Sequence, residues 1–413
     1  VAGSNPADRI VLYFSHSFYP HYFGILFKEH LFLHRSMAWC QLPSRKALRD
    51  SASLMRKKFP KKRKKPESAR TKLVQPIGSR NPYFESLVVR DSYFRFLTRT
   101  KQYLSQQQEQ VIRLEDAGKL YHELGFSRGR KIGKFLLRHP LCFQTYRHDD
   151  GKMWLGFSSP MEDLLDEEKR ILDSLEEDRV TKMRKLLMMS KDQRISLSKL
   201  HHCRLLFGFH NDLRDRVLKY PEYFRVVENS DGKRILELCS WDPSLEVSAL
   251  ERAFVHDEDA TKKAFRFPVK HAKSLGLSID DLEKLELLNT LPLVSPYGDA
   301  GKLLDVRSLE AEKYRLGVLH EFLSLTLEKK ASIHHIVEFR DEFCLTKNTY
   351  DMLKRQYRTF YLAGTEMNWV VFLKNAYTSN GELIDKDPLV RFNEKLQKFA
   401  LMKVDEYHSS LQS

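Results

Sequence analysis

A run of arginine and lysine side chains between residues 128 and 138 is the part of this sequence best suited to chemistry. Three of these residues, Arg130, Lys134 and Arg138, recur at every fourth position. Residues four apart lie on one face of a helix, so a helix here would present a row of cations. Such a row can neutralise phosphates and release counterions, which supplies most sequence-independent affinity for nucleic acid. The candidate contacts in this run are Arg128, Arg130, Lys131, Lys134 and Arg138.

A second basic region covers residues 180–225, with 11 Lys and Arg against four acids. Residues 162–178 precede it with nine acids and two bases, which we interpret as a solvated helix face. Positive and negative charge are thus segregated along the chain, as a groove with one positive wall requires. The candidate contacts in the second region are Lys182, Arg184, Lys185, Arg214, Lys219 and Arg225.

Reading a nucleic-acid sequence would need more than cations. Unstacked bases are held on aromatic or guanidinium planes. Tyr146, Trp154 and Phe157 are candidates for such planes, but aromatic residues in this pattern are more often part of the core. The sequence therefore predicts phosphate contacts and identifies no base-reading residue.

The sequence predicts no catalytic residue, no metal site and no cofactor. It contains no GxxxxGK[ST], HExxH or GxSxG pattern. Its five cysteines form no CxxC, which excludes a zinc finger by spacing and is typical of reduced thiols. The pairs His201-His202 and His334-His335 lack partners at ligand spacing. We expect a protein that is not an enzyme and has no small-molecule substrate.

The elements that must position the basic residues are mainly helical. Apolar residues at steps of three and four predict helices over residues 81–100 and 161–189. Three segments, 120–155, 200–238 and 336–373, then share a layout of two helical stretches followed by a strand-like end. We therefore predict a fold that is mainly α with short β-hairpins (α+β), an array of degenerate helix-turn-helix-hairpin units.

The first two copies of this repeat have residues suited to ending their helices and turning their hairpins, whereas the third lacks the proline and the Asp-Gly and keeps only the phenylalanine. A left-handed glycine can end the first helix, a proline the second, and Asp-Gly can form the hairpin turn. A phenylalanine after the second helix would anchor the turn in the core. These residues are Gly125 and Gly208, Pro140 and Pro221, Phe143, Phe224 and Phe360, and Asp150-Gly151 and Asp231-Gly232.

The net charge of +15 lies almost entirely ahead of the repeats. Residues 37–80 carry 14 Lys and Arg against two acids, and Ser and Ala are frequent there. This composition predicts an organellar transit peptide or basic disordered leader over residues 37–79, with mitochondrion preferred to chloroplast. Residues 1–36, which precede the first methionine, are interpreted as a gene-model extension. Charged residues interrupt their apolar stretch, and mean hydropathy is −0.49, so no membrane partner is expected.

Several blocks in fixed order over roughly residues 80–400 resemble one known family. They include MRKLLMMSKDQRISLSKL (183–200), LELCSWDPSLEVSALE (236–251), LPLVSPYGDA (291–300) and GELIDKDPL (381–389). The chain is similar to the plant organelle RNA recognition (PORR) domain family, to which What's-this-factor and root-primordium-defective proteins belong. The resemblance implies a PORR RNA-binding domain over 80–400, with residues 401–413 as a C-terminal tail.

The resemblance also implies a function. Members of the family are imported into chloroplasts or mitochondria, bind RNA and promote splicing of group II introns. The implied partners are group II intron RNA and other organellar splicing factors.

Three alternatives stay open at this stage. A hydrolase or nuclease lacks a supporting motif. A nucleic-acid-binding factor of the mitochondrial-termination-factor type shares only the step from LGF to the proline. A scaffold of a splicing particle that does not touch RNA is the third.

Overall fold

The computed structural model describes residues 80–209, 211–253, 265, 279–302, 304–365 and 368–412. The predicted extension (1–36) and leader (37–79) lie outside the described residues. The predicted fold class, mainly α with short β-hairpins, is confirmed. No helix in the described ranges has both the length and the apolar character needed to cross a membrane.

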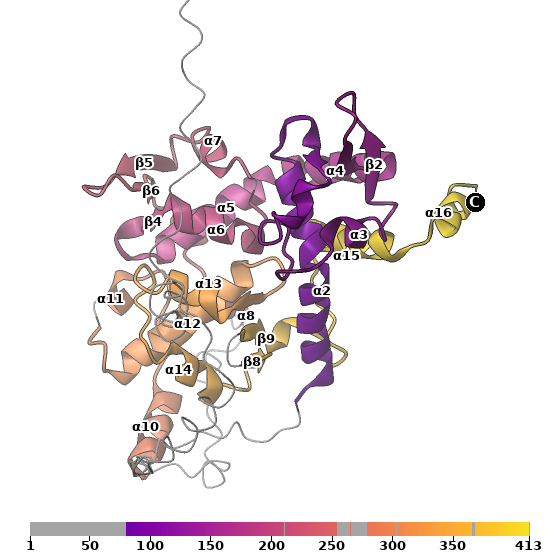
Figure 1. The fold of residues 1–413 in the computed structure, drawn as a ribbon. Coiled ribbons are helices and arrows are strands. Elements are labelled where there is room, and N and C mark those ends of the chain that lie inside the picture. Colours follow the sequence, from indigo (N-terminus) through magenta and orange to yellow (C-terminus); the bar gives the residue numbers. More distant parts are fainter. Residues whose placement is uncertain are drawn as a thin grey trace, which may run out of the picture. The chain divides into compact units, whose positions relative to one another are not determined.

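Helices and three small antiparallel sheets, joined by turns and loops, make up the described chain (Figure 1). The α-helices are α2 (Pro82–Leu104), α3 (Ile132–Leu136), α4 (Ser159–Ser174), α5 (Glu176–Met189), α6 (Leu197–Phe207), α7 (Leu213–Val217), α8 (Ala249–Ala253), α10 (Ile279–Thr290), α11 (Asp299–Lys302), α12 (Leu309–Leu325), α13 (Ile333–Glu338), α14 (Thr349–Arg355), α15 (Pro388–Leu401) and α16 (Val404–Gln412). The strands are β1 (Ile112–Arg113), β2 (Phe143–Arg147), β3 (Met153–Phe157), β4 (Arg194–Ser196), β5 (Phe224–Glu228), β6 (Arg234–Leu238), β7 (Lys330–Ser332), β8 (Phe360–Ala363) and β9 (Val370–Leu373).

The three repeats share one topology, which is richer than the predicted helix-turn-helix-hairpin. We call α2 to β3 the first repeat, α5 to β6 the second and α12 to β9 the third. In each, a long helix leads to a short strand, two short helical segments and a hairpin, and the short strand pairs with the last strand of the hairpin. This is the connectivity of a winged helix-turn-helix, whose third helix is the recognition helix in DNA-binding members.

The short strands β1, β4 and β7 are the elements that the sequence did not predict. They have two or three residues each, too few for apolar alternation to be visible. A left-handed turn precedes each strand, with positive φ at Gln110, Gln193 and Lys329. The common tripeptide pattern Ile112-Arg113-Leu114 and Ile195-Ser196-Leu197 was the available signal.

The residues predicted to shape the hairpins do so. Phe143, Phe224 and Phe360 each begin the hairpin and are at most 5% exposed. Gly151 and Gly232 take positive φ in the hairpin turns. A left-handed position follows the first of the two short helical segments in all three repeats, as the sequence predicts for the first two. Gly125 and Gly208 occupy it in the first two, and the third repeat places Cys344 there at φ 53°.

Several predicted boundaries were wrong. The helix predicted over 161–189 breaks at Leu175 into α4 and α5. The segment 120–125 of the first repeat forms turns instead of a helix. The third helices α3 and α7 end four residues before Pro140 and Pro221, so the prolines lie in the turn into the hairpin.

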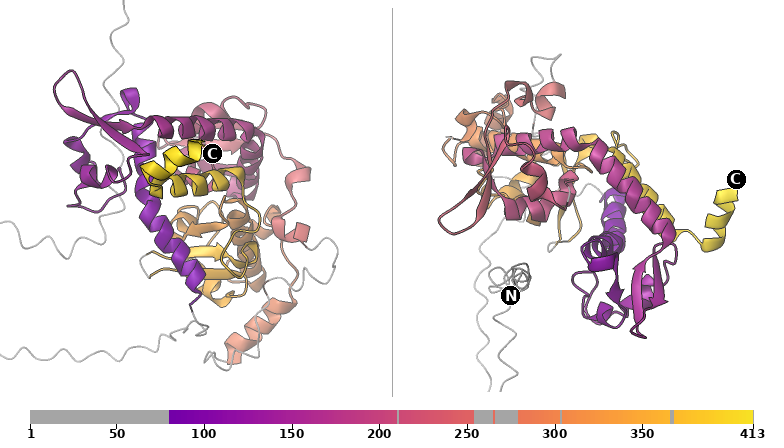
Figure 2. Two further views of the ribbon diagram at one scale, coloured as in Figure 1. Left: turned by 90° about the vertical axis from the view of Figure 1, so that its right-hand side faces the viewer. Right: turned by 90° about the horizontal axis from the view of Figure 1, so that it is seen from above.

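The repeats divide between two apolar cores. The second and third repeats share one core, in which Phe207, Phe322, Phe339 and Phe343 are fully buried. The first repeat forms a second core with α4 and with α15 from the far end of the chain. Helix α15 runs along α4, as both views of Figure 2 show. The first repeat is therefore completed by residues that lie some 300 positions later in the sequence.

Candidate nucleic-acid interface

The first repeat exposes all five basic residues predicted between 128 and 138. Ile132 and Leu136 anchor α3 in the core at 1% and 0% exposure, Phe135 is half-buried beside them, and Lys134 faces outward. Arg130 lies over the ring of Phe135 at 4.8 Å from its centroid. Within the described residues none of the five forms an ion pair. The exposed set is Arg128, Arg130, Lys131, Lys134 and Arg138.

The helix that the sequence predicts through Arg130, Lys134 and Arg138 is shorter in the structure. Helix α3 covers only Ile132–Leu136, so Lys134 is helical while Arg130 and Arg138 flank the helix. The cations therefore follow the loop, helix and exit turn of one recognition-helix segment, in place of one continuous helical face.

In the second repeat only part of the predicted set is available. Arg214 on α7 and Lys219 just after it are exposed and form no ion pair with any described residue. Arg225 on β5 is exposed but lies 2.8 Å from Glu237, which also binds Arg194 at 2.6 Å. The second repeat thus keeps fewer free cations than the first.

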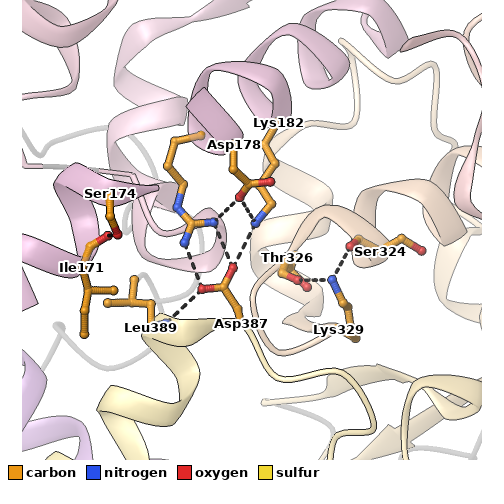
Figure 3. Close-up of polar contacts among 10 residues, drawn as sticks. Ile171, Ser174, Asp178, Lys182, Ser324, Thr326, Lys329, Asp387 and Leu389 are labelled. Carbon is orange, nitrogen blue, oxygen red and sulfur yellow. Dashed lines mark hydrogen bonds and ion pairs between the residues drawn. The ribbon is translucent and has the colours of Figure 1, made fainter. Parts of the chain in front are cut away.

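The remaining three predicted contacts are engaged inside the protein. Lys182 lies 2.9 Å from Asp178 and 3.2 Å from Asp387 (Figure 3). Arg184 pairs with Asp242 at 2.9 Å. Lys185 pairs with Glu321. These three side chains stabilise the fold, and we leave them out of the proposed interface.

Lys185 is the most deeply buried of the eleven candidates. It is 6% exposed, its Nζ lies 3.1 Å from Glu321, and it donates to the Val247 carbonyl at 3.1 Å. Glu321 also accepts from the Tyr297 hydroxyl at 2.6 Å. An ammonium in such a network is required for the packing of α5 against α12 and is closed to RNA.

Asp387 organises the network of Figure 3. It caps α15, where its carboxylate accepts from the Leu389 amide, and it takes two hydrogen bonds from Arg179 at 2.9 and 3.0 Å. Burial raises its pKa, but the hydrogen bonds and charge of Arg179 outweigh this and hold the pKa at about 2. The carboxylate therefore joins the start of α15 to α5 at every physiological pH.

The acidic run 162–178 is only partly the solvated face that the sequence predicts. Glu168 lies 2.5 Å from Lys101, and Glu167 lies 2.6 Å from Lys395. Glu176 and Asp173 both bind Arg216 of the second repeat, at 2.6 and 3.1 Å. Acids of this run thus hold neighbouring elements together.

The structure brings together histidines for which the sequence offered no partners. The rings of His202 on α6 and His335 on α13 are 5.5 Å apart. His202 Nδ1 lies 2.6 Å from Glu338, and the donor atoms of His202, Cys203 and Glu338 lie within 4.8 Å of one another. The hydrogen bond that the Glu338 carboxylate accepts from His202 raises the pKa of His202. These three residues could offer ligands to a metal, but their ion pair already explains the cluster as a clamp between α6 and α13.

A cavity lies between α2, the segment 377–386 and α15. Its charged lining includes Arg90, Glu328 and Lys330. Lys330 lies 2.6 Å from Asp91 and pairs with Glu328, and these neighbouring charges raise its pKa although burial opposes this. Lys330 is thus paired with the two acids beside it, and we leave it out of the interface.

Sequence reasoning missed one correspondence among the basic residues. When the hairpin phenylalanines Phe143, Phe224 and Phe360 are superposed in sequence, Arg138, Lys219 and Arg355 fall at one position. All three stand at the end of the third helix or directly after it, but Arg355 pairs with Glu312 at 2.5 Å. The signal was present in the sequence, since the aligned repeats would have shown it.

Comparison with known proteins agrees with this architecture. The plant organelle RNA recognition domain matches residues 79–405. The chain is 35% identical over 336 residues to the chloroplastic What's This Factor 1 homolog of Arabidopsis thaliana, covering 78% of this chain and 62% of that protein. It is 31% identical over 298 residues to Root Primordium Defective 1 of the same plant, covering 68% of this chain and 71% of that protein.

A more distant relative is the mitochondrial What's This Factor 9 of Arabidopsis thaliana, 24% identical over 337 residues, with 79% of this chain and 84% of that protein covered. No solved structure matches. The chain spans less than two thirds of the length of the chloroplastic What's This Factor 1 homolog. The match over most of the chain shows that the protein belongs to the plant organelle RNA recognition domain family.

Proposed function

We propose that the protein binds group II intron RNA in an organelle and promotes splicing, with the first repeat as its principal RNA contact. The observation that carries this proposal is the set of five exposed cations around α3 that no described acid neutralises. Cations without internal partners are the ones available to phosphates. Family membership and the names of the relatives support RNA as the polyanion.

The splicing chemistry in this proposal belongs to the RNA. Group II introns would react through their own folded form, and the protein would bind that form more tightly than unfolded alternatives. Differential binding of this kind shifts the population of the active RNA without a catalytic residue. Other organellar splicing factors are proposed as partners because the family membership supports them.

The organelle also belongs to the proposal. The leader composition favours the mitochondrion, whereas the relative with 35% identity is chloroplastic and the one with 24% identity is mitochondrial. The higher identity favours the chloroplast. Immunoprecipitation from each organelle, followed by sequencing of the bound RNA, identifies both the compartment and the intron.

Charge reversal tests the interface directly. The triple variant Arg130→Glu, Lys134→Glu and Arg138→Glu should weaken binding of single-stranded intron RNA about 100-fold at about 0.1 M salt and flatten the salt dependence by about two units of slope. The matched control reverses Lys169, Arg170 and Lys403, three exposed cations elsewhere, with the same change in net charge. Wild-type affinity and slope in the first variant would remove these residues from the interface.

The helix-turn-helix order favours one second candidate, binding of duplex DNA through the same third helix. Competition separates the two. Intron RNA should displace bound RNA at a far lower concentration than duplex DNA of equal length, and the reverse ranking would favour the DNA-binding reading.

A further inference from the structure

The outer faces of the three sheets differ although the sheets share one topology. One face of each sheet packs on the helices of its own repeat, with Phe143, Phe224 and Phe360 pointing into the core. The opposite face carries the alternate residues of each strand. What covers that opposite face is different in every repeat.

The third repeat has its outer face covered by α2. Phe84 stacks on Tyr361 at 4.7 Å between ring centroids and contacts Phe372 at 5.0 Å, and Phe372 is completely buried. The second repeat closes the same position with charge, since Glu237 lies between Arg194 and Arg225. The third face is thus covered by α2, and on the second face the two arginines are paired with Glu237.

The first repeat leaves its outer face open and lines it with a row of aromatic and cationic side chains. The register pairs Tyr146 with Trp154 and Trp154 with Arg113, so the three lie side by side across β2, β3 and β1. Tyr146 is 36% exposed, and the Arg113 guanidinium lies 5.4 Å from the Trp154 ring centroid. At the neighbouring position Gly156 stands where the other two sheets have Glu237 and Phe372, and the side chains of Val111 and Tyr146 pack over it.

The row is held in place from within its own repeat. Trp154 donates its indole N–H to Asp150 at 3.2 Å, and the His148 ring lies 5.2 Å from it. Leu114, which follows Arg113, is so close to α3 that a Cβ on Gly133 would meet it at 2.7 Å. The end of β1 that carries Arg113 thus touches the helix that carries the free cations. In Figure 2 the β2–β3 hairpin projects away from the other repeats.

We propose that Tyr146, Trp154 and Arg113 form a platform on which an unpaired RNA base stacks, while the α3 segment binds the adjoining phosphates. This inference rests on the proposed RNA-binding function and extends it to the base. Indole and guanidinium planes accept any base by stacking. Arg113 within the row and Lys152 near its hairpin turn are exposed and form no ion pair with described residues, which suits a polyanionic strand.

The test uses the full chain and a short unstructured oligouridylate, with an abasic oligomer of equal length as the second probe. Trp154→Leu should weaken binding of the oligouridylate about tenfold, within the range for loss of one stacked base. Its salt slope should stay at the wild-type value because stacking releases no counterion. Trp154→Phe should retain most of the affinity, and the abasic oligomer should bind the wild type and Trp154→Leu equally.

The controls separate failure of this inference from failure of RNA binding itself. Ile235→Ala changes the corresponding position of the second repeat and should leave affinity unchanged. If Trp154→Leu does not fold, the exposed variants Tyr146→Ser and Arg113→Gln carry the same test. A Trp154→Leu protein that binds as tightly as wild type overturns the platform alone. A wild type that binds neither oligomer overturns the proposed function.

Discussion

The third-helix segments of the first and second repeats occupy the same place in the same topology and carry opposite arrangements of charge. Where the first repeat has Lys131 and Lys134, the second has Asp212 and Asp215 at the corresponding positions. The second repeat also has Arg216 there, but this side chain binds Asp173, Glu176 and Asp212.

The difference shows how one fold can be used for two tasks. In the second repeat Arg216 joins α7 to the junction of α4 and α5, so its charge is neutralised within the protein. In the first repeat Lys131 and Lys134 point to solvent and form no ion pair with described residues. A count of Lys and Arg along the sequence cannot separate these cases, because both regions are basic.

The largest effect expected from this contrast is on stability. Lys185→Met leaves the Glu321 carboxylate buried without its ammonium partner and should lower the free energy of unfolding by about 3 kcal/mol. The matched change Lys134→Met, on the exposed helix of the first repeat, should leave that free energy unchanged within error. Urea unfolding of both variants measures the difference. Equal destabilisation would contradict the division between structural and free cations.

A smaller effect is expected when the second repeat is given the charge of the first. Asp215→Lys places a lysine at the position that corresponds to Lys134, on an exposed site. It should tighten binding of single-stranded RNA about fivefold at about 0.1 M salt, since one added phosphate contact steepens the salt slope by about 0.7. Asp215→Asn is the control that removes the acid alone. No change in slope would show that the second repeat lies away from the RNA.

The smallest effect is on pH dependence, where the first repeat and the clamp between α6 and α13 should differ. The raised pKa of His202 means that its pair with Glu338 contributes stability fully below the unfolded value near 6.5 and loses it as pH rises through the folded value. The melting temperature of the wild type should therefore fall slightly more than that of His202→Gln between about pH 6 and pH 8. RNA affinity through arginine and lysine should stay flat over the same range.

Much of each repeat could be predicted from local residues. Glycines with positive φ, the Asp-Gly turns and the phenylalanine that begins each hairpin act through neighbouring backbone, and the sequence shows them directly. The exposure of the cations around α3 could also be predicted, because Ile132 and Leu136 identify the buried side of that segment.

The features that could not be predicted depend on contacts between distant residues. Lys185 and Arg184 resemble free surface cations in the sequence, and only the arrival of Glu321 and Asp242 makes them structural. Likewise Trp154 and Phe157 alternate on one strand, yet the sheet buries Phe157 at 3% exposure and leaves Trp154 on the outer face. Strand β1, which has only two residues, pairs Ile112 with the buried Leu155 and Arg113 with Trp154, so Arg113 lies beside Trp154 on the outer face.

The insertion of α15 into the core of the first repeat has a consequence for how the protein matures. A chain emerging from the ribosome has made the whole α3 segment long before it has made Phe392, Leu396 and Phe399, which that core contains. Contacts of such sequence separation form late, because a long loop must close first. The first repeat is thus finished last, and a product cut short before residue 388 would have the other two repeats built and this one left open to proteases.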